Sequence, residues 1–414
     1  HFSSMDYRIV PMASPIPQNS PIYNLFILLL RVGQLIGLFP LHFSRERGTP
    51  GVRFQWISYK TVYSGGVVIL LIFVTVSCYI TGWLVDDGWT FRHILRTVFY
   101  TSSMFTTIAL LRSTRRIPIL MQKWMDIDYL LGAKYGYPPH AIRYTKCAII
   151  VTFLCCLGQI LLFSLYTLQH VKVKAVSRNI TYHERLYFIA MFPQIFEHLP
   201  YNLLLGLLCQ CCYMLSIHGM AYLDLLISLI GLFFSLRYQQ ITKKLRAVVW
   251  KVNQPEPNPT FWKDIREDYN RICVLGCDIE NIITNLIFVS YACNLLLSLV
   301  YLRYITVIPG FTTEKVYNIV CFAVYATKMF LTSVYLSKVN VTSLEASIPL
   351  NSVSTRQYNV EIQRLLQQIN GNCVAFTGNK VFRVTRHIVL HIFAIMLTYE
   401  LVLVQFSQLN FHIH

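Results

Sequence analysis

The 414-residue chain has little charge, since only 13% of its residues are Asp, Glu, Lys or Arg. A soluble domain usually carries about a quarter. Among the charged residues the acidic ones are fewer, with 19 Asp and Glu against 36 Lys and Arg. Hydrophobic residues make up 55% of the chain. This composition excludes an ordinary soluble protein and indicates an integral membrane protein. Because no linker-like composition separates the apolar stretches, we expect a single membrane domain.

The sequence also lacks the motifs of the common enzyme classes. It has no hydrolytic triad, phosphate-binding Gly-rich loop or paired carboxylates at diagnostic spacing. The twelve cysteines include no second pair or His partner at metal-site spacing. We therefore expect no enzyme activity, no cofactor and no metal site. Nine cysteines lie inside apolar runs, where we expect them to pack in the interior: Cys78, Cys147, Cys155, Cys156, Cys209, Cys211, Cys212, Cys293 and Cys321.

A formal charge of +17 raises the question of nucleic-acid binding, because basic surfaces attract phosphate backbones. The basic residues instead form short clusters beside hydrophobic stretches. That distribution is typical of Lys and Arg that set membrane topology and meet anionic lipid. We therefore expect a lipid bilayer, and no nucleic acid, as the partner of these charges.

Seven apolar runs approach the ~20 residues that cross the hydrocarbon core as a helix. The second is short and must borrow Phe91, Ile94 and Leu95, with Arg92 or Arg96 reaching toward the interface. The fourth, if helical throughout, is roughly 57 Å long and extends beyond the bilayer. The sequence thus predicts an all-α protein with seven transmembrane helices: 66–85, 97–111, 147–169, 199–236, 281–302, 316–337 and 387–409.

Two further helices are expected outside these runs. Residues 24–39 are apolar between two prolines and predict an amphipathic or re-entrant helix. Residues 357–370 show helical spacing of apolar side chains. We expect a cytoplasmic N-terminal segment, 1–62, and a channel-like membrane domain, 63–414, with cytoplasmic polar stretches at 237–275 and 338–386. The start of the chain has no signal-peptide pattern, so targeting is expected to rest on the spans.

The distribution of basic residues predicts the orientation. Connections on one side of the predicted spans hold 27 Lys and Arg, those on the other side hold 8, and Lys328 lies within a span. Because positive charge stays cytoplasmic, we expect the N-terminus inside and the C-terminus outside. The glycosylation sequon at Asn179 falls on the predicted outer side, in agreement with this count. The orientation is opposite to that of G-protein-coupled receptors.

Two charged residues lie in the middle of predicted spans, Lys328 in the sixth and Glu400 in the seventh. Charged groups persist in hydrocarbon when they face a partner, a cavity or a pore. One hypothesis is that the two pair with each other. The alternative is that Lys328 faces a water-filled interior without touching Glu400.

Aromatic residues occur beside carboxylates, amides and imidazoles at the outer ends of several predicted spans. Aromatic faces accept the C–H side of a sugar ring, and polar groups bond its hydroxyls. The same Trp and Tyr are also expected at a membrane interface for solvation reasons alone. The candidate ligand-binding residues are Trp83, Asp86, Trp89, Gln159, Glu197, His198, Tyr201, Asn202, Tyr291, Asn294 and Tyr325.

The last predicted span ends in the sequence TYELVLVQFSQL. Thr398, Val402, Gln405 and Leu409 fall near one helical face, with Phe406 beside Gln405. An apolar ring of such residues can close a pore by dewetting. Core packing explains the same spacing equally well.

The same residues carry a resemblance to a known family. Thr398 and Tyr399, five mainly apolar residues, then Gln405 and Phe406 resemble the C-terminal signature of insect gustatory receptors. Glu400 after Thr-Tyr is similar to the sugar-receptor branch. The stretches TGNKVFRVTRHIVL, RFQWISYKTVYS and YLDLLISLIGLFFSLRYQQI are also similar to that branch, whereas FPLHFSRERGTPGVRF is looser.

The resemblance implies a sugar-gated, non-selective cation channel in the plasma membrane of chemosensory neurons. Such channels are homotetramers or heterotetramers that pass monovalent and divalent cations, with four copies of the last helix around the pore. A mono- or disaccharide would bind in the outer half of each subunit. By position, Val402, Gln405, Phe406 and Leu409 would form the gate, Thr398 and Tyr399 would brace the helix, and sugar binding would withdraw Phe406 from the pore axis.

Three other functions stay open at this point. A G-protein-coupled receptor would place 27 basic residues outside, against the usual rule. A transporter would be favoured by paired broken helices and by ligand flux without current. A related odorant-receptor-type channel shares the predicted topology.

Overall fold

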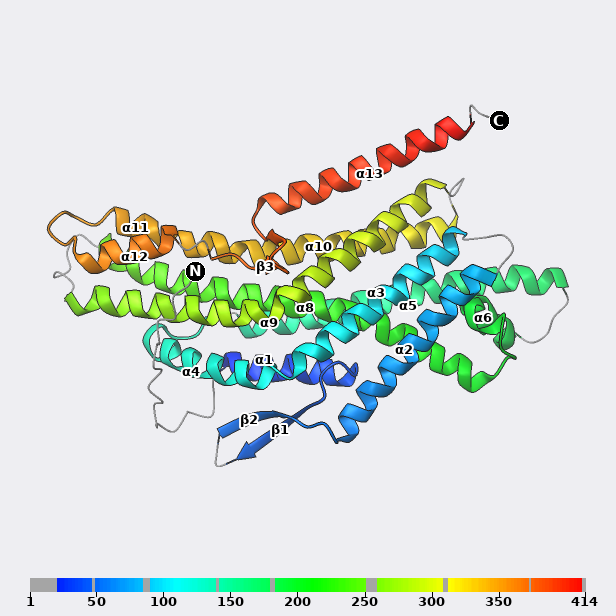
Figure 1. Cartoon of the computed structure of the whole chain (residues 1–414), viewed down its shortest axis with the longest axis horizontal. Coiled ribbons are helices and arrows are strands. Elements are labelled where there is room, and N and C mark those ends of the chain that lie inside the picture. Colours follow the sequence, from blue (N-terminus) through cyan, green and yellow to red (C-terminus); the bar gives the residue numbers. More distant parts are fainter. Residues whose placement is uncertain are drawn as a thin grey trace.

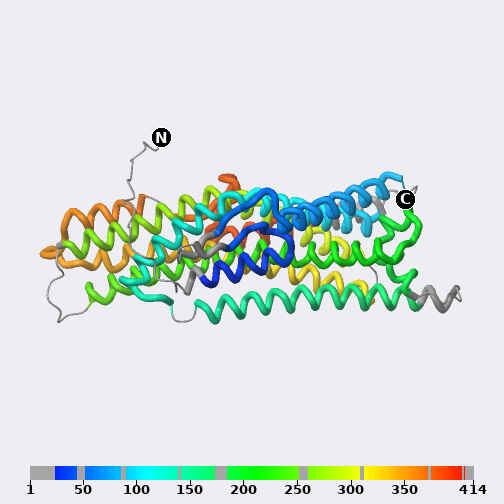
Figure 2. The backbone as a smooth tube through the Cα atoms, turned by 90° about the horizontal axis from the view of Figure 1, so that it is seen from below, coloured from blue at the N-terminus to red at the C-terminus, as the bar shows by residue number. Residues whose placement is uncertain are grey.

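The computed structural model describes residues 21–46, 49–84, 90–138, 141–178, 183–250, 259–307, 312–371 and 374–411. These form an elongated bundle of long helices with two small β-hairpins (Figure 1). A view turned by 90° shows the same elongated body, with α1 lying alongside its middle (Figure 2). The two ends of the bundle are called here the α6 end and the α12 end.

The elements follow one another along the chain with short connections. The helices are α1 (Pro21–Leu35), α2 (Tyr59–Leu84), α3 (Phe91–Thr114), α4 (Ile117–Tyr135), α5 (Ala141–Arg178), α6 (His183–Met191), α7 (Pro193–Phe196), α8 (Leu203–Val249), α9 (Pro259–Val307), α10 (Thr313–Leu344), α11 (Ser347–Asn351), α12 (Val360–Gly371) and α13 (His387–Phe411). The strands are β1 (Leu41–Glu46), β2 (Thr49–Phe54), β3 (Thr377–Gly378) and β4 (Phe382–Arg383), paired antiparallel as β1–β2 and β3–β4.

Six helices in the described part of the chain are long and apolar enough to cross a membrane: α2, α3, α5, α8, α9 and α10. Each overlaps one of the first six predicted spans. Helix α3 begins at Phe91, so it includes Phe91, Ile94 and Leu95, which the short second run was expected to need. Most of the fourth run, from Leu203 on, lies in α8, one continuous helix of 47 residues that ends at Val249. The seventh run forms α13. The apolar part of α13 that the structure describes, His387–Val402, is shorter than any of the six candidate spans. The seventh span therefore stays a prediction.

Helix α8 is the central helix of the bundle, and α5 is peripheral. In the most apolar 18-residue window of each helix, 89% of the residues of α8 are buried against 17% of those of α5. Helices α3, α5, α9 and α10 all pack against α8. At Gly231 of α8 an added Cβ would lie 2.8 Å from the carbonyl oxygen of Tyr335 on α10. A glycine is thus required where these two backbones approach each other.

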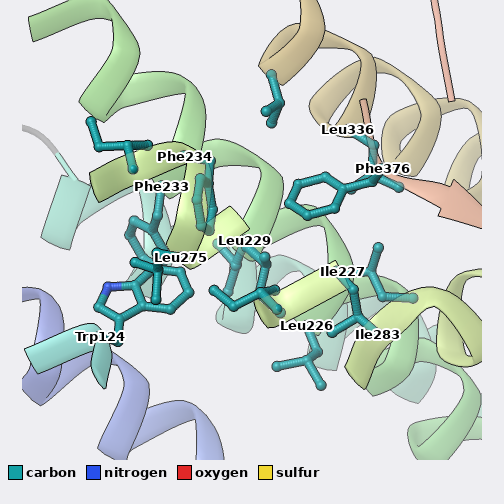
Figure 3. Packing of buried hydrophobic residues seen from close by; sticks show 14 of the residues in the cluster. Trp124, Leu226, Ile227, Leu229, Phe233, Phe234, Leu275, Ile283, Leu336 and Phe376 are labelled. Carbon is teal, nitrogen blue, oxygen red and sulfur yellow. The ribbon is translucent and has the colours of Figure 1, made fainter. Parts of the chain in front are cut away.

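The main hydrophobic core joins α8 and α9 to α4, α10 and the segment before β3 (Figure 3). The ring centroid of Phe234 lies 5.2 Å from that of Trp124 and 5.7 Å from that of Phe376, in edge-to-face contacts. Helix α1 joins this core, since Phe26 packs on Trp124 at 4.5 Å. The predicted amphipathic helix is confirmed as a helix, and its apolar face is buried against protein.

Toward the α12 end, helices α4, α8 and α9 are joined by buried charge pairs. Asp268, which is 1% exposed, accepts hydrogen bonds from Lys134 Nζ at 3.0 Å, Tyr135 Oη at 3.0 Å and Arg271 Nη1 at 2.9 Å. The pKa of Tyr135 is raised above its usual value, mainly because the side chain is buried and also because Asp268 is negatively charged. This hydroxyl therefore stays protonated and donates its hydrogen bond. Arg237 similarly pairs with the buried Asp128.

Two expectations need correction. The fold is not purely helical, because the segment that resembled the family least forms the β1–β2 hairpin and another hairpin precedes α13. The cysteines are also not all interior: Cys147, Cys155 and Cys211 are exposed. They lie on helix faces that other helices of the chain leave uncovered, whereas the other six are buried.

Candidate ligand-binding site

A cavity of about 450 Å³ lies at the α6 end of the bundle. Residues of α3, α5, α6, α7, α8, α9 and α10 line it. The long helices supply its walls, and the short helices α6 and α7 supply part of its boundary. A cavity of this size can hold a small organic ligand.

One wall of the cavity is aromatic. The rings of Tyr166 on α5 and Tyr317 on α10 are stacked, with centroids 6.2 Å apart and planes inclined by 4°. Phe163, one turn before Tyr166, packs on Tyr317 at 5.3 Å and on Tyr213 of α8 at 5.1 Å. These contacts hold three helices together and fix the ring faces that line the cavity.

A charged cluster joins α3, α9 and α10 at the cavity. Arg92 donates to Glu314 at 3.0 Å and to the hydroxyl of Tyr304 at 2.9 Å. Tyr304 in turn donates to Glu314 at 2.5 Å. Arg92 stays half-exposed, with 50% of its side chain accessible. The cluster leaves a polar surface on the side of the cavity near the helix ends.

Two other polar side chains line the cavity with hydrogen-bonding capacity unused. Gln194 on α7 is 1% exposed, and neither its amide nitrogen nor its amide oxygen has a partner. Arg96 of α3, one turn from Arg92, has an unpartnered buried Nη1. Leaving a buried polar group unpaired costs about 1–3 kcal/mol. A ligand with hydroxyl groups can satisfy both donors and the acceptor.

Three of the eleven predicted ligand-binding residues lie in or directly beneath the cavity. Glu197 lines it. Tyr325 is buried below the lining, where its ring stacks on lining residue Tyr301 with centroids 5.7 Å apart. Gln159 is buried too, with Nε2 at 4.0 Å from Cys321 Sγ and its amide oxygen unpartnered.

Several of the other predicted ligand-binding residues do not line the cavity and have structural contacts. His198 bonds the Thr81 hydroxyl at 3.1 Å, and Asn202 caps α8 by accepting from Leu204 N at 2.9 Å. Tyr201 packs on a neighbouring phenylalanine near the start of α8. Trp83 is exposed at the end of α2. Asp86 and Trp89, with the sequon residue Asn179, lie outside the described residues.

Tyr291 and Asn294 belong to a buried polar network on α9, away from the cavity. Asp224 of α8 accepts hydrogen bonds from Ser290 at 2.5 Å and Asn294 at 2.9 Å. The Tyr291 hydroxyl lies 2.7 Å from that of Ser333 on α10. These bonds connect three central helices.

The Lys328–Glu400 pair is not formed within this single chain. The Lys328 ammonium lies 4.7 Å from the ring centroid of Tyr325. Neither this ammonium nor the two Glu400 carboxylate oxygens has a hydrogen-bond partner in the described residues. Of the two hypotheses, the structure matches the one in which Lys328 does not touch Glu400.

Helix α13 extends away from the β3–β4 hairpin and from the body of the bundle (Figure 1). Ile392 and Met396 are buried against the bundle. Thr398, Val402 and Gln405, on the predicted pore-facing side, are exposed, as is Tyr399. Phe406 and Leu409 lie in α13, and their side chains fall outside the described part.

The sequence did carry a signal for the cavity residues that were missed. Arg92 and Arg96 are one helical turn apart near the start of a span, and Glu314 lies near the start of another. Opposite charges at the same predicted depth point to a common site. The stacked tyrosines give no such signal, because a Tyr in an apolar run reads the same whether it lines a cavity or packs in a core. In the described residues no group of His, Cys, Asp and Glu could hold a metal ion.

A comparison with known proteins identifies the family. Residues 19–412 match the family described as Trehalose receptor. The chain belongs to this family of insect gustatory receptors. It is a multi-pass membrane protein of receptor type, and the predicted family resemblance is confirmed.

Relatives with assigned functions extend along most of the chain. The "Gustatory receptor for sugar taste 64f" of Drosophila melanogaster is 24% identical over 392 residues, which cover 92% of this chain and 80% of the relative. The "Gustatory receptor 5a for trehalose" of the same species is 26% identical over 223 residues, or 54% of this chain and 49% of that receptor.

Solved structures show the same fold at lower sequence identity. The insect olfactory receptor OR5 from Machilis hrabei in complex with eugenol has a TM-score of 0.66 and 15% identity, covering 92% of this chain and 99% of that one. The same receptor in a second structure gives a TM-score of 0.67 at 14% identity. This likeness establishes the fold alone.

Proposed function

We propose that the chain is a subunit of a sugar-gated cation channel that acts as a taste receptor, and that the cavity binds a neutral mono- or disaccharide. The observation that carries the proposal is a stacked aromatic wall in the cavity that Arg96 and Gln194 also line, with Arg96 Nη1 and the Gln194 amide unpartnered. Aromatic faces bind the apolar side of a pyranose ring, and amide and guanidinium groups bond its hydroxyls. The names of the relatives, receptors for sugar taste and for trehalose, support this ligand class.

The proposed assembly is a homotetramer or heterotetramer in the plasma membrane of chemosensory neurons, with the N-terminus and residues 1–62 inside. Helix α13 crosses as the seventh span and lines a central pore for monovalent and divalent cations. Its exposed apolar residues, among them Leu390, Leu397 and Leu401, support a contact with other subunits or lipid. Gln405 and Phe406, with Val402 and Leu409, form the gate.

The coupling we propose between cavity and gate runs along α9. Tyr301 and Tyr304 of α9 line the cavity. Farther along the same helix, Thr284 donates to the carbonyl of Thr377 and accepts from the backbone N–H of Asn379, both at 3.0 Å. That hairpin leads directly into α13. A ligand that binds better to one position of α9 therefore shifts the position of α13.

The test is whole-cell current in cells expressing the chain, challenged with monosaccharides, disaccharides and bitter compounds. A rapid cation current to a sugar is expected. Gln194→Ala removes hydrogen bonds to the ligand worth about 1 kcal/mol or more, so the half-activating concentration should rise about tenfold. The matched control is Gln210→Ala on α8, which also has an unpartnered amide oxygen but does not line the cavity.

The outcomes separate the competing functions. Equal shifts in the Gln194 and Gln210 variants would contradict the assigned site. Sugar uptake without current, measured with a radiolabelled sugar in the same cells, would indicate a transporter. Silence with the chain at the cell surface would be followed by co-expression with a related receptor, which restores current if the native channel is a heterotetramer.

A further inference from the structure

Three arginines share one surface at the junction of α3 and α4. Arg112 lies in the last turn of α3, and Arg115 and Arg116 follow it directly. Arg115 (φ −66°, ψ −29°) and Arg116 (φ −90°, ψ −18°) keep right-handed helical backbone. Positions i, i+3 and i+4 therefore lie on one face. All three side chains are exposed, and we name this group the arginine corner.

The arginine corner has no counter-charge within the described part of the chain. No carboxylate pairs with any of its three arginines there, although the chain pairs Arg92, Arg237 and Arg266 with Glu or Asp. The sequence contains no Asp or Glu in residues 49–85 or 88–125. Three neighbouring guanidinium groups repel one another unless an anion lies between them. An anion from outside the chain would therefore relieve this repulsion.

An exposed aromatic and apolar surface adjoins the arginine corner. The Arg115 guanidinium carbon lies 4.0 Å from the ring centroid of Trp56, in the segment between β2 and α2. Trp56 is 62% exposed, and the next residue, Ile57, is 96% exposed. Strand β2 also packs on α4, which fixes the hairpin beside the corner. Basic and apolar groups are thus presented together.

This surface lies where two candidate membrane spans end. Helix α2 begins at Tyr59, directly after Trp56 and Ile57, and α3 ends at Thr114, within the arginine corner. The β1–β2 hairpin projects sideways from the long axis of the bundle at this level (Figure 1). If α2 and α3 cross the bilayer, the hairpin extends along its surface, at the depth of the lipid headgroups.

We propose that the arginine corner, with Trp56 and Ile57, binds the headgroup of an anionic phospholipid. The guanidinium forks bond the phosphate and carboxylate oxygens of the headgroup. The Trp56 ring sits at the boundary of the hydrocarbon, where its amphipathic indole is favoured. The inference depends on α2 and α3 crossing the membrane and is independent of which ligand occupies the cavity.

The experiment uses the full chain in phosphatidylcholine nanodiscs that contain a minor fraction of brominated lipid. Bromine quenches Trp fluorescence on contact, and the quenching lost in Trp56→Phe reports lipid at this surface. Brominated phosphatidylserine should quench Trp56 with an apparent affinity about tenfold above that of brominated phosphatidylcholine, as expected for a few basic side chains at a membrane surface. Added NaCl should abolish this preference, since salt screens exposed charges.

Two matched triple variants each remove three positive charges, one at the arginine corner and one elsewhere on the surface. Arg112→Gln, Arg115→Gln and Arg116→Gln together should abolish the phosphatidylserine preference. Lys243→Gln on α8, Lys263→Gln on α9 and Arg356→Gln between α11 and α12 change exposed residues outside the corner and should leave the preference unchanged. If the first triple variant does not fold, the Arg112→Gln and Arg116→Gln single variants and the salt titration replace it.

Three results would overturn the inference. One is equal quenching of Trp56 by the two brominated lipids. Another is the same loss of preference in both triple variants. The third is displacement of phosphatidylserine by inorganic phosphate, which would indicate a site for a soluble anion. Because none of these measurements uses a sugar, their failure is independent of any failure of the proposed channel function.

Discussion

The two ends of the bundle use polar residues in opposite ways. Toward the α12 end, the buried carboxylate of Asp268 accepts from Lys134, Tyr135 and Arg271, and the buried carboxylate of Asp128 pairs with Arg237. At the α6 end, Arg96 and Gln194 line a cavity of about 450 Å³, and Arg96 Nη1 and the Gln194 amide are buried without a partner. These buried carboxylates are paired within the chain, whereas these two cavity-lining side chains keep atoms without a partner.

This difference separates stability from binding. A buried ion pair is costly to break, because removal of one partner leaves the other charge desolvated. An unpartnered amide at a cavity contributes nothing comparable to folding, yet it can bond a ligand. Substitutions toward the α12 end should therefore lower thermal stability, and substitutions at the α6 end should change the ligand response.

The largest effect is expected at Asp268. Asp268→Asn removes the negative charge that three donors share, and Lys134 and Arg271 lose their buried partner. We expect a loss of about 3 kcal/mol in stability, because the hydrogen bonds to a buried charge are weakened while Lys134 and Arg271, 38% and 39% exposed, regain contact with water. The measurement is the thermal unfolding midpoint of the purified receptor, followed by the intrinsic fluorescence of its tryptophans.

The neighbouring residue provides the control. Glu267 is 40% exposed, and its carboxylate lies 3.9 Å from Arg271. Exposed pairs of this kind contribute about 0–1 kcal/mol, so Glu267→Gln should leave the midpoint nearly unchanged. A similar fall in both variants would mean that the net charge of this region, and not the buried network, determines its stability.

An intermediate effect is expected where α8 meets α10. Gly231→Ala places a methyl group 2.8 Å from a backbone carbonyl oxygen that cannot move without shifting α10. Overpacking of this kind costs about 1–3 kcal/mol. Surface expression and the thermal midpoint measure the loss. The result tests whether the tight packing of the α12 half continues through the middle of the bundle.

Gly158 on the peripheral helix α5 is the matched control. An added Cβ at Gly158 meets no atom within 4 Å. Alanine has a higher helix propensity than glycine by about 1 kcal/mol, so Gly158→Ala should keep or raise stability. Equal destabilisation of both variants would contradict the distinction between central and peripheral helices.

Helix positions were predictable from the sequence because the apolar runs are long. A run of twenty apolar residues has few alternatives to a helix when water is absent. The start of helix α9 was harder to predict, because the helix begins at Pro259, well before its apolar run starts. The β1–β2 hairpin was missed because its alternating polar and apolar stretches, 41–44 and 52–54, are too short to stand out.

The sequence predicted the types of residue at the cavity, but not most of the individual residues that line it. Composition indicated aromatic and polar residues near the span ends, and of the predicted ligand-binding residues Glu197 lines the cavity. His198 and Asn202 were assigned to ligand because a sequence does not show which polar groups already have a partner. Both bond within the chain, to Thr81 and to the start of α8. Pairing between distant helices decides which groups remain for a ligand.

The smallest effect on stability, and the sharpest test of the comparison, is expected at Tyr304. Tyr304→Phe removes the hydroxyl that bridges Arg92 and Glu314 at the cavity. The direct Arg92–Glu314 pair remains and is half-exposed, so the thermal midpoint should change by no more than about 1 kcal/mol in free energy. The half-activating sugar concentration should nevertheless change several-fold, because the hydroxyl group of a cavity-lining residue is lost.

Tyr291→Phe separates the two roles of a tyrosine hydroxyl. Its hydroxyl lies 2.7 Å from Ser333 in the buried network of α9 and α10, away from the cavity. Its loss should lower stability by about 1–2 kcal/mol and leave the half-activating sugar concentration unchanged. Suppose instead that Tyr304→Phe lowers stability and Tyr291→Phe shifts the sugar response. The cavity would then not be the part of the bundle that binds ligand, and the buried network would not be the part that stabilises it. The coupling along α9 would then begin below the cavity, in the network around Asp224.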